Sequence, residues 1–482
     1  MTVREVELPQ DTARPSDEAP AAALPLAPQE GVIPVALPDE TTGRARLVHG
    51  PLGRTIAAVS LPAVASTLLM TVFGTADAYW VGRYLGGRGL AAVSISVFWI
   101  WGIIALAEMV SVGLTSVAAR RYGEGNPRAA ARAVGDALVF ALGVGALVSI
   151  VGLLWLDALF AAMSAPADVT ALGKQYLGTY LLGAPLIFGF FAIDAGFRAA
   201  GNTQTPFLLL AVSVTVALFL DPVLILGLGP VPALGITGAA VATVVTRGVV
   251  FIAGLTLLLR RRMLIFGAVA WRTVRTVARI GLPTAITGVF FSTIYVVLTR
   301  TTAQFGTPAL AALGVGHRVE SWAYMIGVGF GAAAAAIIGQ NLGARQYARA
   351  ERAGWIATGF ATAVATLAGV LEFIFAEQFA AMFTTDEAVI AESVRYLRIS
   401  ALSTILIGAE LVLEGALGGA GYTLAPMLTS SSLTALRVPL AAWAAPRWGA
   451  AAIWWTISLT AAARALAMLY LWRSGRWKGK SL

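Results

Sequence analysis

The dominant feature of the sequence is a succession of long apolar stretches, separated by short segments that carry most of the charge. Hydrophobic residues make up 58% of the 482 residues and charged residues only 12%, with a mean hydropathy of +0.79. A soluble globular protein has about 25% charged residues, so this chain lacks the charge for a water-exposed surface all round. Each stretch has about 20 or more residues, enough for a helix to cross a hydrocarbon core of about 30 Å. The stretches lack the alternation of a membrane barrel. The sequence therefore predicts an all-α integral membrane protein.

We predict twelve transmembrane helices, six in each half of the chain. The predicted spans are 55–82, 90–118, 130–157, 172–200, 205–227 and 236–259, followed by 276–302, 309–339, 350–376, 392–420, 425–444 and 450–472. Arginines gather in alternate connections, such as 120–132 and 260–279, whereas the other connections are poor in cations. Because cationic loops stay in the cytoplasm, this pattern predicts a multi-pass plasma (inner) membrane protein with both termini cytoplasmic. The same loops explain the net charge of +9, so we expect no nucleic-acid partner.

The residue inventory excludes several kinds of chemistry. The chain has no Cys and only two His, which excludes disulfides, zinc–thiolate sites and iron–sulfur clusters and disfavours a His-based metal site. A nucleotide-binding G-x-x-x-x-G-K-[ST] stretch is also absent. We therefore expect no catalytic residues, no metal and no cofactor besides a coupling ion. Nothing in the sequence indicates an oligomer, so we expect a monomer among membrane lipids.

The chain divides into a tail and two lobes. Residues 1–50 are rich in proline and charge and contain no long apolar run, which predicts a disordered cytoplasmic tail. Residues 51–262 are predicted to form an N-terminal six-helix lobe, and residues 272–474 a C-terminal six-helix lobe.

An internal repeat relates the two predicted lobes at an offset of 220 residues. Ala200-Gly201-x-Thr203 matches Ala420-Gly421-x-Thr423, Gly123 matches Gly343, and Tyr176-Leu177 matches Tyr396-Leu397. Six spans is an even number, so both halves insert the same way up, as a parallel repeat about an axis along the membrane normal. Two such lobes would enclose a central cavity, and rocking of the lobes would give alternating access.

Several segments are similar to a known transporter family. The residues that carry the similarity are Ala76-Asp77-Ala78-Tyr79-Trp80-Val81-Gly82, Phe197-Arg198-Ala199-Ala200-Gly201-Asn202-Thr203-Gln204-Thr205-Pro206, Leu220-Asp221-Pro222, Gly316-His317-Arg318-Val319-Glu320-Ser321 and Gly339-Gln340-Asn341-Leu342-Gly343-Ala344. Together, across about residues 52–472, they resemble the multidrug and toxic compound extrusion (MATE) family, in its prokaryotic branch named for DNA-damage-inducible protein F. The resemblance implies a twelve-helix, two-lobe antiporter that exports organic, often cationic, compounds against H⁺ or Na⁺.

Asp77, Asp221 and Thr243 are the candidate residues for cation coupling. A carboxylate within a span costs about 2.5–3.5 kcal/mol on insertion scales and usually faces the protein interior. The predicted topology puts all three residues roughly 9–12 Å below the outer face, at 1.5 Å per residue. Two carboxylates in a low-dielectric pocket repel each other when both are ionised, so we expect one to hold a proton near neutral pH. The alternatives are an Asp77 that reaches water at the interface and a Thr243 that serves in helix packing.

The resemblance implies the same three residues. The related branch uses an Asp in the first span, an Asn-x-x-x-Asp pair in the fifth and a Thr in the sixth. Asp77, Asp221 and Thr243 match these positions, whereas the Asn position falls on Ala217. Loss of an amide ligand weakens the case for Na⁺, which needs several oxygens, so H⁺ is the expected coupling ion and Na⁺ the alternative.

Two roles are open for each of two further residues, Glu320 and Trp322. Glu320 would contact a cationic substrate or second ion, or would pair structurally with Arg318 or His317. Trp322 would line a substrate cavity through cation–π contact or lie at the membrane interface.

Asp194 and Glu414 are related by the repeat, and Arg198 lies one helical turn from Asp194. An i,i+4 pair of opposite charge stabilises a helix, so we interpret these residues as structural or gating. Arg437, near the middle of its span, is expected to face the cavity or an acid.

The predicted function is secondary active efflux of small organic, cationic compounds. A lipid-linked oligosaccharide flippase is one alternative, although such proteins often have a basic cavity and the charges in these spans are mainly acidic. An integral membrane transferase is a weaker alternative, because the chain offers few residues for a catalytic site.

Overall fold

The computed structural model describes residues 46–161, 167–229 and 232–480, which all belong to one compact unit, Leu37–Leu482. The predicted disordered tail, 1–50, lies almost wholly outside these residues. Helices are the only regular elements in the described ranges. The expectation of an all-α protein is therefore confirmed.

The first predicted pair of spans forms a single long element with a break. Helix α2 (Leu52–Gly123) contains the two apolar helices Leu52–Gly86 and Arg88–Gly123. Gly86 has φ 69° and ψ −166°, a conformation open to glycine because it has no Cβ. The chain thus changes direction at Gly86 without a loop.

The remaining helices follow the predicted order. In the first half they are α3 (Pro127–Leu154), α4 (Leu156–Ala161), α5 (Ala167–Leu182), α6 (Ala184–Ala199), α7 (Gln204–Leu226) and α8 (Ile236–Arg260). In the second half they are α9 (Trp271–Ala303), α10 (Thr307–Gly343), α11 (Tyr347–Ile374), α12 (Ala376–Ala381), α13 (Glu387–Gly419), α14 (Leu424–Ala435), α15 (Arg437–Trp448) and α16 (Ala450–Arg473), with the short 3₁₀ helix η1 (Arg476–Gly479) at the end.

Ten of the described helices are long and apolar enough to span a membrane, and two predicted spans are broken. Helices α5 and α6 together form an eleventh span, bent by 50°. Helices α14 and α15 meet at Leu436 and correspond to the predicted span 425–444. Each of the twelve predicted spans thus has a helix or a broken helix, which confirms the twelve-helix fold.

Side-chain caps explain where some helices begin. The Asn126 side chain accepts a hydrogen bond from the Ala129 amide at the start of α3, and Pro127 occupies the first turn. The Asp386 carboxylate accepts from the Ala388 and Val389 amides at the start of α13. These contacts satisfy amide groups that have no partner within the helix.

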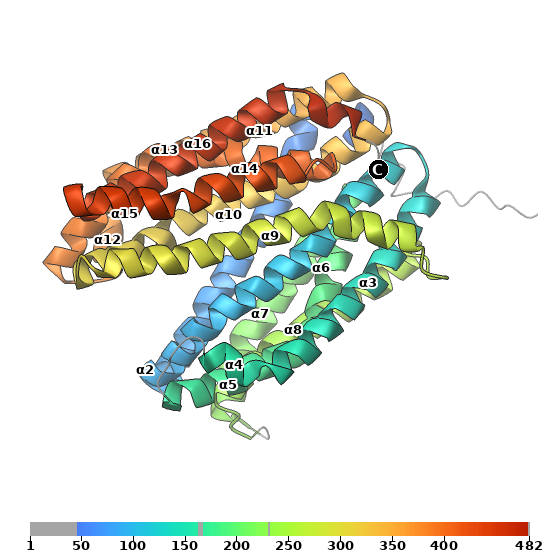
Figure 1. The fold of residues 1–482 in the computed structure, drawn as a ribbon. Coiled ribbons are helices and arrows are strands. Elements are labelled where there is room, and N and C mark those ends of the chain that lie inside the picture. The colour runs from blue at the N-terminus through green and yellow to red at the C-terminus, as the bar shows by residue number, and fades with distance from the viewer. Residues whose placement is uncertain (1–45, 162–166, 230–231, 481–482) are drawn as a thin grey trace, which may run out of the picture. The chain divides into compact units, whose positions relative to one another are not determined.

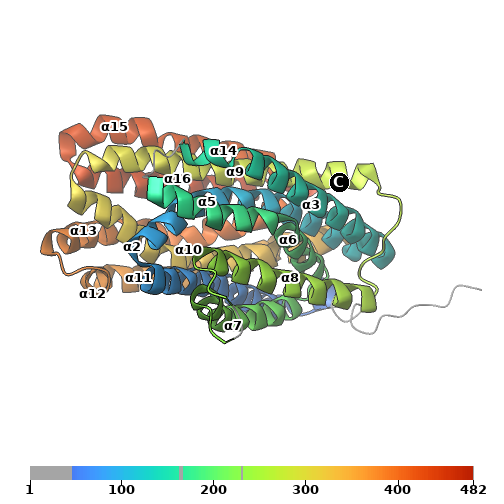
Figure 2. The same ribbon diagram turned by 90° about the horizontal axis from the view of Figure 1, so that it is seen from below.

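The helices form two bundles, seen in Figures 1 and 2 as blue to green (first half) and yellow to red (second half). The two halves also share packing. Val277, Ile280 and Ala285 of α9 join the core of the first half, whereas Ile56 and Val59 of α2 join a core of the second half. The first helix of each half therefore packs against the other bundle as well as its own.

The bundles meet at the end where the arginine-rich connections lie, here called the basic end. A Cβ on Gly123 would collide with the carbonyl oxygen of Gln340, and a Cβ on Gly343 with the carbonyl oxygen of Arg120. Both Gly343 and Gln340 lie 220 residues after their counterparts, Gly123 and Arg120. The repeat thus produces a reciprocal backbone contact between α2 and α10, which closes the basic end.

Candidate functional site

Asp77 and Asp221 come from separate helices and lie in the same interior region of the first bundle. Asp77 belongs to α2 and Asp221 to α7, and their side chains are 5% and 0% exposed. The two carboxyl groups are close enough to interact electrostatically. Counted along the helices at 1.5 Å per residue, both lie roughly 7–14 Å from the helix ends opposite the basic end. The structure thus brings both acids together inside the protein, facing neither lipid nor water.

The two carboxyl groups differ in their hydrogen bonds. Tyr176 Oη of α5 donates to Asp77 Oδ2 at 2.9 Å. Asp77 Oδ1 and both oxygens of Asp221 are fully enclosed and have no hydrogen-bond partner among the described residues. An ionised carboxylate without donors is costly in such surroundings. The pair is therefore stable when it carries a proton or holds a cation.

Thr243 and Ala217 provide no further oxygen ligand beside the carboxyl groups of Asp77 and Asp221. Thr243 of α8 is buried, and its hydroxyl donates to the Ala239 carbonyl at 3.3 Å; no hydrogen bond joins it to either aspartate in the described part of the chain. Ala217, where the resemblance expects an amide, is 1% exposed and apolar. The two aspartates thus have three unpaired carboxyl oxygens, and neither Thr243 nor Ala217 adds a hydrogen bond to them in the described residues.

Tyr176 is a site residue that sequence reasoning missed. Its hydroxyl contacts Asp77, and the neighbouring Tyr180 interacts electrostatically with the same carboxylate. The signal was present in the sequence, because Tyr176 matches Tyr396 at the repeat offset. The structure shows why that match matters: Tyr396 Oη donates to Glu320 Oε2 at 3.1 Å in the second bundle.

Glu320 therefore pairs with a tyrosine, and neither Arg318 nor His317 forms a hydrogen bond or ion pair with it within the described ranges. The His317 ring packs edge-on against Tyr295, with ring centroids 4.3 Å apart. Trp322 is 47% exposed and has no hydrogen bond to Glu320 in the described residues. The structure does not bring Trp322 and Glu320 into one polar cluster.

Glu372 of α11 is a second residue that the sequence analysis missed. It is 3% exposed and accepts hydrogen bonds from Ser400 at 2.6 Å and Thr404 at 3.0 Å, both on α13. It also interacts electrostatically with Glu320. Glu372 lies near the end of α11, and only helix packing shows that it is enclosed.

Asp194 forms the expected ion pair with Arg198, at 2.7 Å, and Arg198 also donates to Ser111 at 2.6 Å. Its repeat counterpart, Glu414, has no ion pair within 4 Å in the described structure. Glu414 instead interacts electrostatically with Glu410, with Arg464 and with Glu108 from the first bundle. The two repeat positions therefore differ in charge balance, and Glu414 contributes to an acidic region where the bundles meet.

Four arginines lie in the interior of the described spans. Arg437 donates to Thr460 at 2.7 Å and to Tyr295 at 3.0 Å, and Arg464 pairs with Glu410 at 3.2 Å. Arg437 interacts with Glu320 and Glu410 only at longer range. Arg198 contacts Asp194 and Ser111, whereas Arg247 of α8 has no hydrogen bond or ion pair among the residues that the structure describes. The sequence analysis overlooked Arg247 and Arg464.

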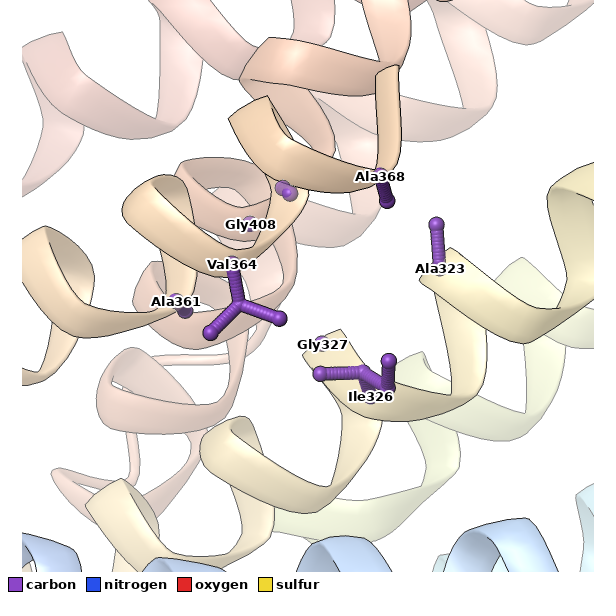
Figure 3. A pocket seen from close by; sticks show the side chains of 8 residues that line it. Ala323, Ile326, Gly327, Ala361, Val364, Ala368 and Gly408 are labelled. Carbon is purple, nitrogen blue, oxygen red and sulfur yellow. The ribbon is translucent and has the colours of Figure 1, made fainter. Parts of the chain in front are cut away.

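Two hollows in the structure lie away from these residues. A recess between α10, α11 and α13, shown in Figure 3, is lined by apolar residues such as Ala323, Ile326 and Val364 and leaves no room for water. A wider hollow of about 330 Å³ lies at the basic end, lined by Arg120, Arg345, Lys478 and neighbouring residues. Neither hollow contains the interior carboxylates.

A family model and several known proteins are similar to this chain. The model described as MatE matches residues 62–223 and 283–443, which together exceed half of the chain and repeat the offset seen in the sequence. The FAD transporter of Shewanella oneidensis is 28% identical over 402 residues, covering 82% of this chain and 89% of that protein. The probable multidrug resistance protein NorM of Thermotoga maritima is 29% identical over 396 residues, covering 80% and 83%.

The fold is similar to that of solved transporters. A MOP superfamily transporter from Pyrococcus furiosus, described as having a binding pocket of reverse polarity, superposes with a TM-score of 0.84 at 22% identity and covers 91% of this chain and 99% of that one. The twelve helices, the internal repeat and the two matched segments lead to one conclusion: the chain belongs to the MatE family and is an integral membrane transporter of the multidrug and toxic compound extrusion type.

Proposed function

We propose that this protein is a secondary active antiporter that exports small organic molecules in exchange for H⁺ bound at Asp77 and Asp221. The observation that carries the proposal is the pair of enclosed carboxyl groups, with three oxygens that have no partner in the described residues. Such a pair gains or loses a proton at a large electrostatic cost unless the surrounding helices adjust. Proton binding and helix packing are thereby linked.

The proposed cycle uses the two bundles as alternating halves. We place the basic end, and both termini, in the cytoplasm because of the arginine-rich connections. The backbone contact of Gly123 and Gly343 with the opposite helix then closes the cytoplasmic side. In this outward-facing state a proton reaches Asp77 and Asp221, the first bundle repacks, and the substrate leaves outside. The inward-facing state releases the proton and takes up new substrate.

The energetics suffice for uphill export. One charge that crosses a potential of about 100 mV supplies about 2.3 kcal/mol. Each 1.4 kcal/mol corresponds to a factor of ten in concentration. For each net charge moved, the potential alone would therefore support a substrate concentration ratio of about 1.6 powers of ten across the membrane.

The proposed substrates are small organic compounds, including cations. Glu108 and Glu414 interact electrostatically where the bundles meet and have no ion pair within 4 Å in the described residues, unlike Glu410, so these two acids supply negative charge for a cationic group. Relatives named for multidrug resistance agree with a broad range of small molecules. The relative named as an FAD transporter extends that range to an anionic nucleotide.

Transport into sealed proteoliposomes tests this function. Purified protein would be given a panel of cationic dyes under an imposed H⁺ gradient, and in a separate set under an imposed Na⁺ gradient. We expect dye movement under the H⁺ gradient that stops when a protonophore is added. Dye movement driven by Na⁺ alone would contradict proton coupling, and turnover of a substrate in detergent would indicate an enzyme.

A further inference from the structure

Arg247 occupies an unusual position in the first bundle. It is the one charged residue of α8 before the helix reaches Arg260, and it lies one helical turn from Thr243 toward the basic end. Its side chain is 8% exposed. The guanidinium carbon lies 5.0 Å from the ring centroid of Phe190 and 5.6 Å from that of Phe73. A full positive charge thus lies deep in the bundle, beside two aromatic rings.

The Arg247 guanidinium has neither a hydrogen bond nor an ion pair with any residue that the structure describes. Its Nη1 is fully enclosed without a hydrogen bond, and none of its nitrogens donates to any residue that the structure describes. No carboxylate oxygen lies within 4 Å of it in the described ranges. The guanidinium interacts electrostatically with Tyr180 of α5 and with Asp194, whose carboxylate is already paired with Arg198 at 2.7 Å.

The other interior arginines show that this state is specific to Arg247. Arg437 has three hydrogen bonds to Thr460, Tyr295 and the Ile457 carbonyl. Arg464 has Glu410 and Thr434. Both guanidinium groups thus have polar partners, as expected of buried charges, although Arg464 Nε faces Glu410 at 3.2 Å without forming a hydrogen bond. Other buried arginines in this fold therefore have polar partners from neighbouring helices, whereas Arg247 has none among the described residues.

An unpaired charge in the membrane interior needs a compensating group. Cation–π contacts stabilise the charge but leave the N–H donors without hydrogen bonds. A guanidinium presents five donors in a planar fork, whose geometry matches a carboxylate or a phosphate. Arginines and other ionisable groups within spans commonly mark the path of a substrate.

We propose that Arg247 binds the carboxylate or phosphate group of a transported molecule inside the first bundle, with Phe73 and Phe190 in contact with its apolar part. This proposal rests on the proposed export function and specifies one substrate class: amphipathic, aromatic molecules that bear an anionic group. A zwitterion satisfies both this site and the acidic region around Glu108 and Glu414. The bound anionic group neutralises Arg247, so entry of the substrate relieves the cost of the unpaired charge.

Matched ligand pairs test the proposal without reliance on a membrane gradient. The carboxylate pair is a fluorescent rhodamine free acid and its cationic methyl ester. The phosphate pair is flavin mononucleotide and riboflavin. Binding would be measured by fluorescence anisotropy with the full-length protein in detergent. We expect the native protein to bind the acid at least about tenfold more tightly than the ester, since a hydrogen bond between charged groups contributes about that factor or more.

Variants of the protein test whether Arg247 causes the preference for the anionic ligand. Arg247→Gln should remove the preference within each pair by weakening the anionic member about tenfold and the other member less than about threefold. Arg247→Lys should retain part of the preference, because it keeps the charge and loses the fork. Arg437→Gln is the matched control: it removes a buried arginine and should weaken both members of a pair equally.

Each outcome decides the matter. Equal binding of the acid and ester by the native protein, or an unchanged preference in Arg247→Gln, overturns the proposal. If Arg247→Gln does not fold, the native ligand pairs and Arg247→Lys still decide it. Competition with phosphatidylglycerol in nanodiscs separates the two sources of anion, because loss of probe binding there in the native protein alone would assign Arg247 to lipid. If the native protein prefers the anionic ligand but no ion gradient drives transport in proteoliposomes, the export function is wrong and the Arg247 site stands.

Discussion

At the scale of single residues, the surroundings of each carboxyl group distinguish structural acids from candidate coupling acids. Asp194 and Glu410 have arginine partners at 2.7 Å and 3.2 Å, and Glu372 has two hydroxyl donors. Asp221 is fully enclosed with neither kind of partner in the described residues. The partners of Glu410 and Glu372 lie on another helix and that of Asp194 lies within α6, so these acids are held by structural contacts, whereas Asp221 can exchange a proton without breaking such a contact.

Replacement of Asp77 by asparagine tests its proposed role. Asp77→Asn keeps the size of the side chain and its contact with Tyr176 but removes the exchangeable charge. We expect the variant to fold and to lose gradient-driven export almost completely, measured as dye transport in proteoliposomes. Asp157→Asn is the control, because the Asp157 side chain is 90% exposed, and it should transport normally. Full transport by Asp77→Asn would exclude the role.

The hydroxyl of Tyr176 should tune the same site. Tyr176→Phe removes one hydrogen bond of 2.9 Å to Asp77 and leaves the ring in place. Because a hydrogen bond to a charged group contributes about 1.5–3 kcal/mol, we expect transport at a fixed pH to fall by about tenfold or more. The Tyr470→Phe variant, at a residue that is 69% exposed, is the control. Equal transport by both variants would show that the Tyr176 hydroxyl has no part in coupling.

The sequence predicts which acids lie in the membrane but not what they contact. Depth along a span follows from residue counting, and this was enough to group Asp77 with Asp221. A hydrogen bond between helices depends on rotation and packing, so Tyr176 and the hydroxyls around Glu372 were not identified. Arg247 was within reach of sequence reasoning, because it is an isolated charge in an apolar run of α8.

At the scale of elements, glycines determine how closely the helices approach. Gly281 on α9 lies against the Met109 backbone, and a Cβ added to Gly329 on α10 would lie only 2.5 Å from Val64 Cα. Small residues let helix backbones meet in membranes, where dispersion forces and hydrogen bonds replace the hydrophobic effect between helices. The contacts between α2 and both α9 and α10 depend on such positions.

A bulky residue at the basic-end contact should prevent its closure. Gly343→Leu would drive a side chain into the Arg120 carbonyl, so we expect the two bundles to separate at this end and export to fall severely. Gly314→Leu lies on the same helix, where a Cβ meets nothing within 4 Å, and should transport normally.

Accessibility of the basic end gives the corresponding measurement. The native chain has no cysteine, so a single cysteine introduced at Gln340 reports exposure through its rate of thiol labelling. We expect faster labelling in the Gly343→Leu background than in the Gly314→Leu background. Equal labelling rates would show that this contact does not close the basic end.

Span positions were predictable from apolar length, but breaks within spans were missed. Helix α5 ends before Gly183, and Pro185 lies in the first turn of α6, where its missing N–H does no harm. The break at Leu436 has a similar cause. Pro439 has no N–H for the carbonyl of Ala435, and its ring crowds that carbonyl. Both prolines are visible in the sequence, whereas the 50° bend follows from packing.

At the scale of the whole described unit, the repeat explains both the symmetry and its departures. The two family-model matches and the reciprocal glycine contacts preserve the relation between the halves. The acids do not follow it: position 297, which corresponds to Asp77, is a valine, and position 441, which corresponds to Asp221, is an alanine. One bundle thus carries the aspartate pair, and the other carries Glu320 and Glu372.

This asymmetry underlies the central claim that one bundle couples a proton to export. If protons bind at Asp77 and Asp221, substrate moving down its own gradient must move protons the opposite way. A proteoliposome experiment with a pH-sensitive dye inside the vesicles measures this counterflow directly, without an imposed proton gradient.

We expect a substrate gradient to change the internal pH with the native protein and not with Asp77→Asn or Asp221→Asn, although both variants still bind substrate. Substrate movement by the native protein without any proton movement, or unchanged proton movement in both aspartate variants, would contradict the account.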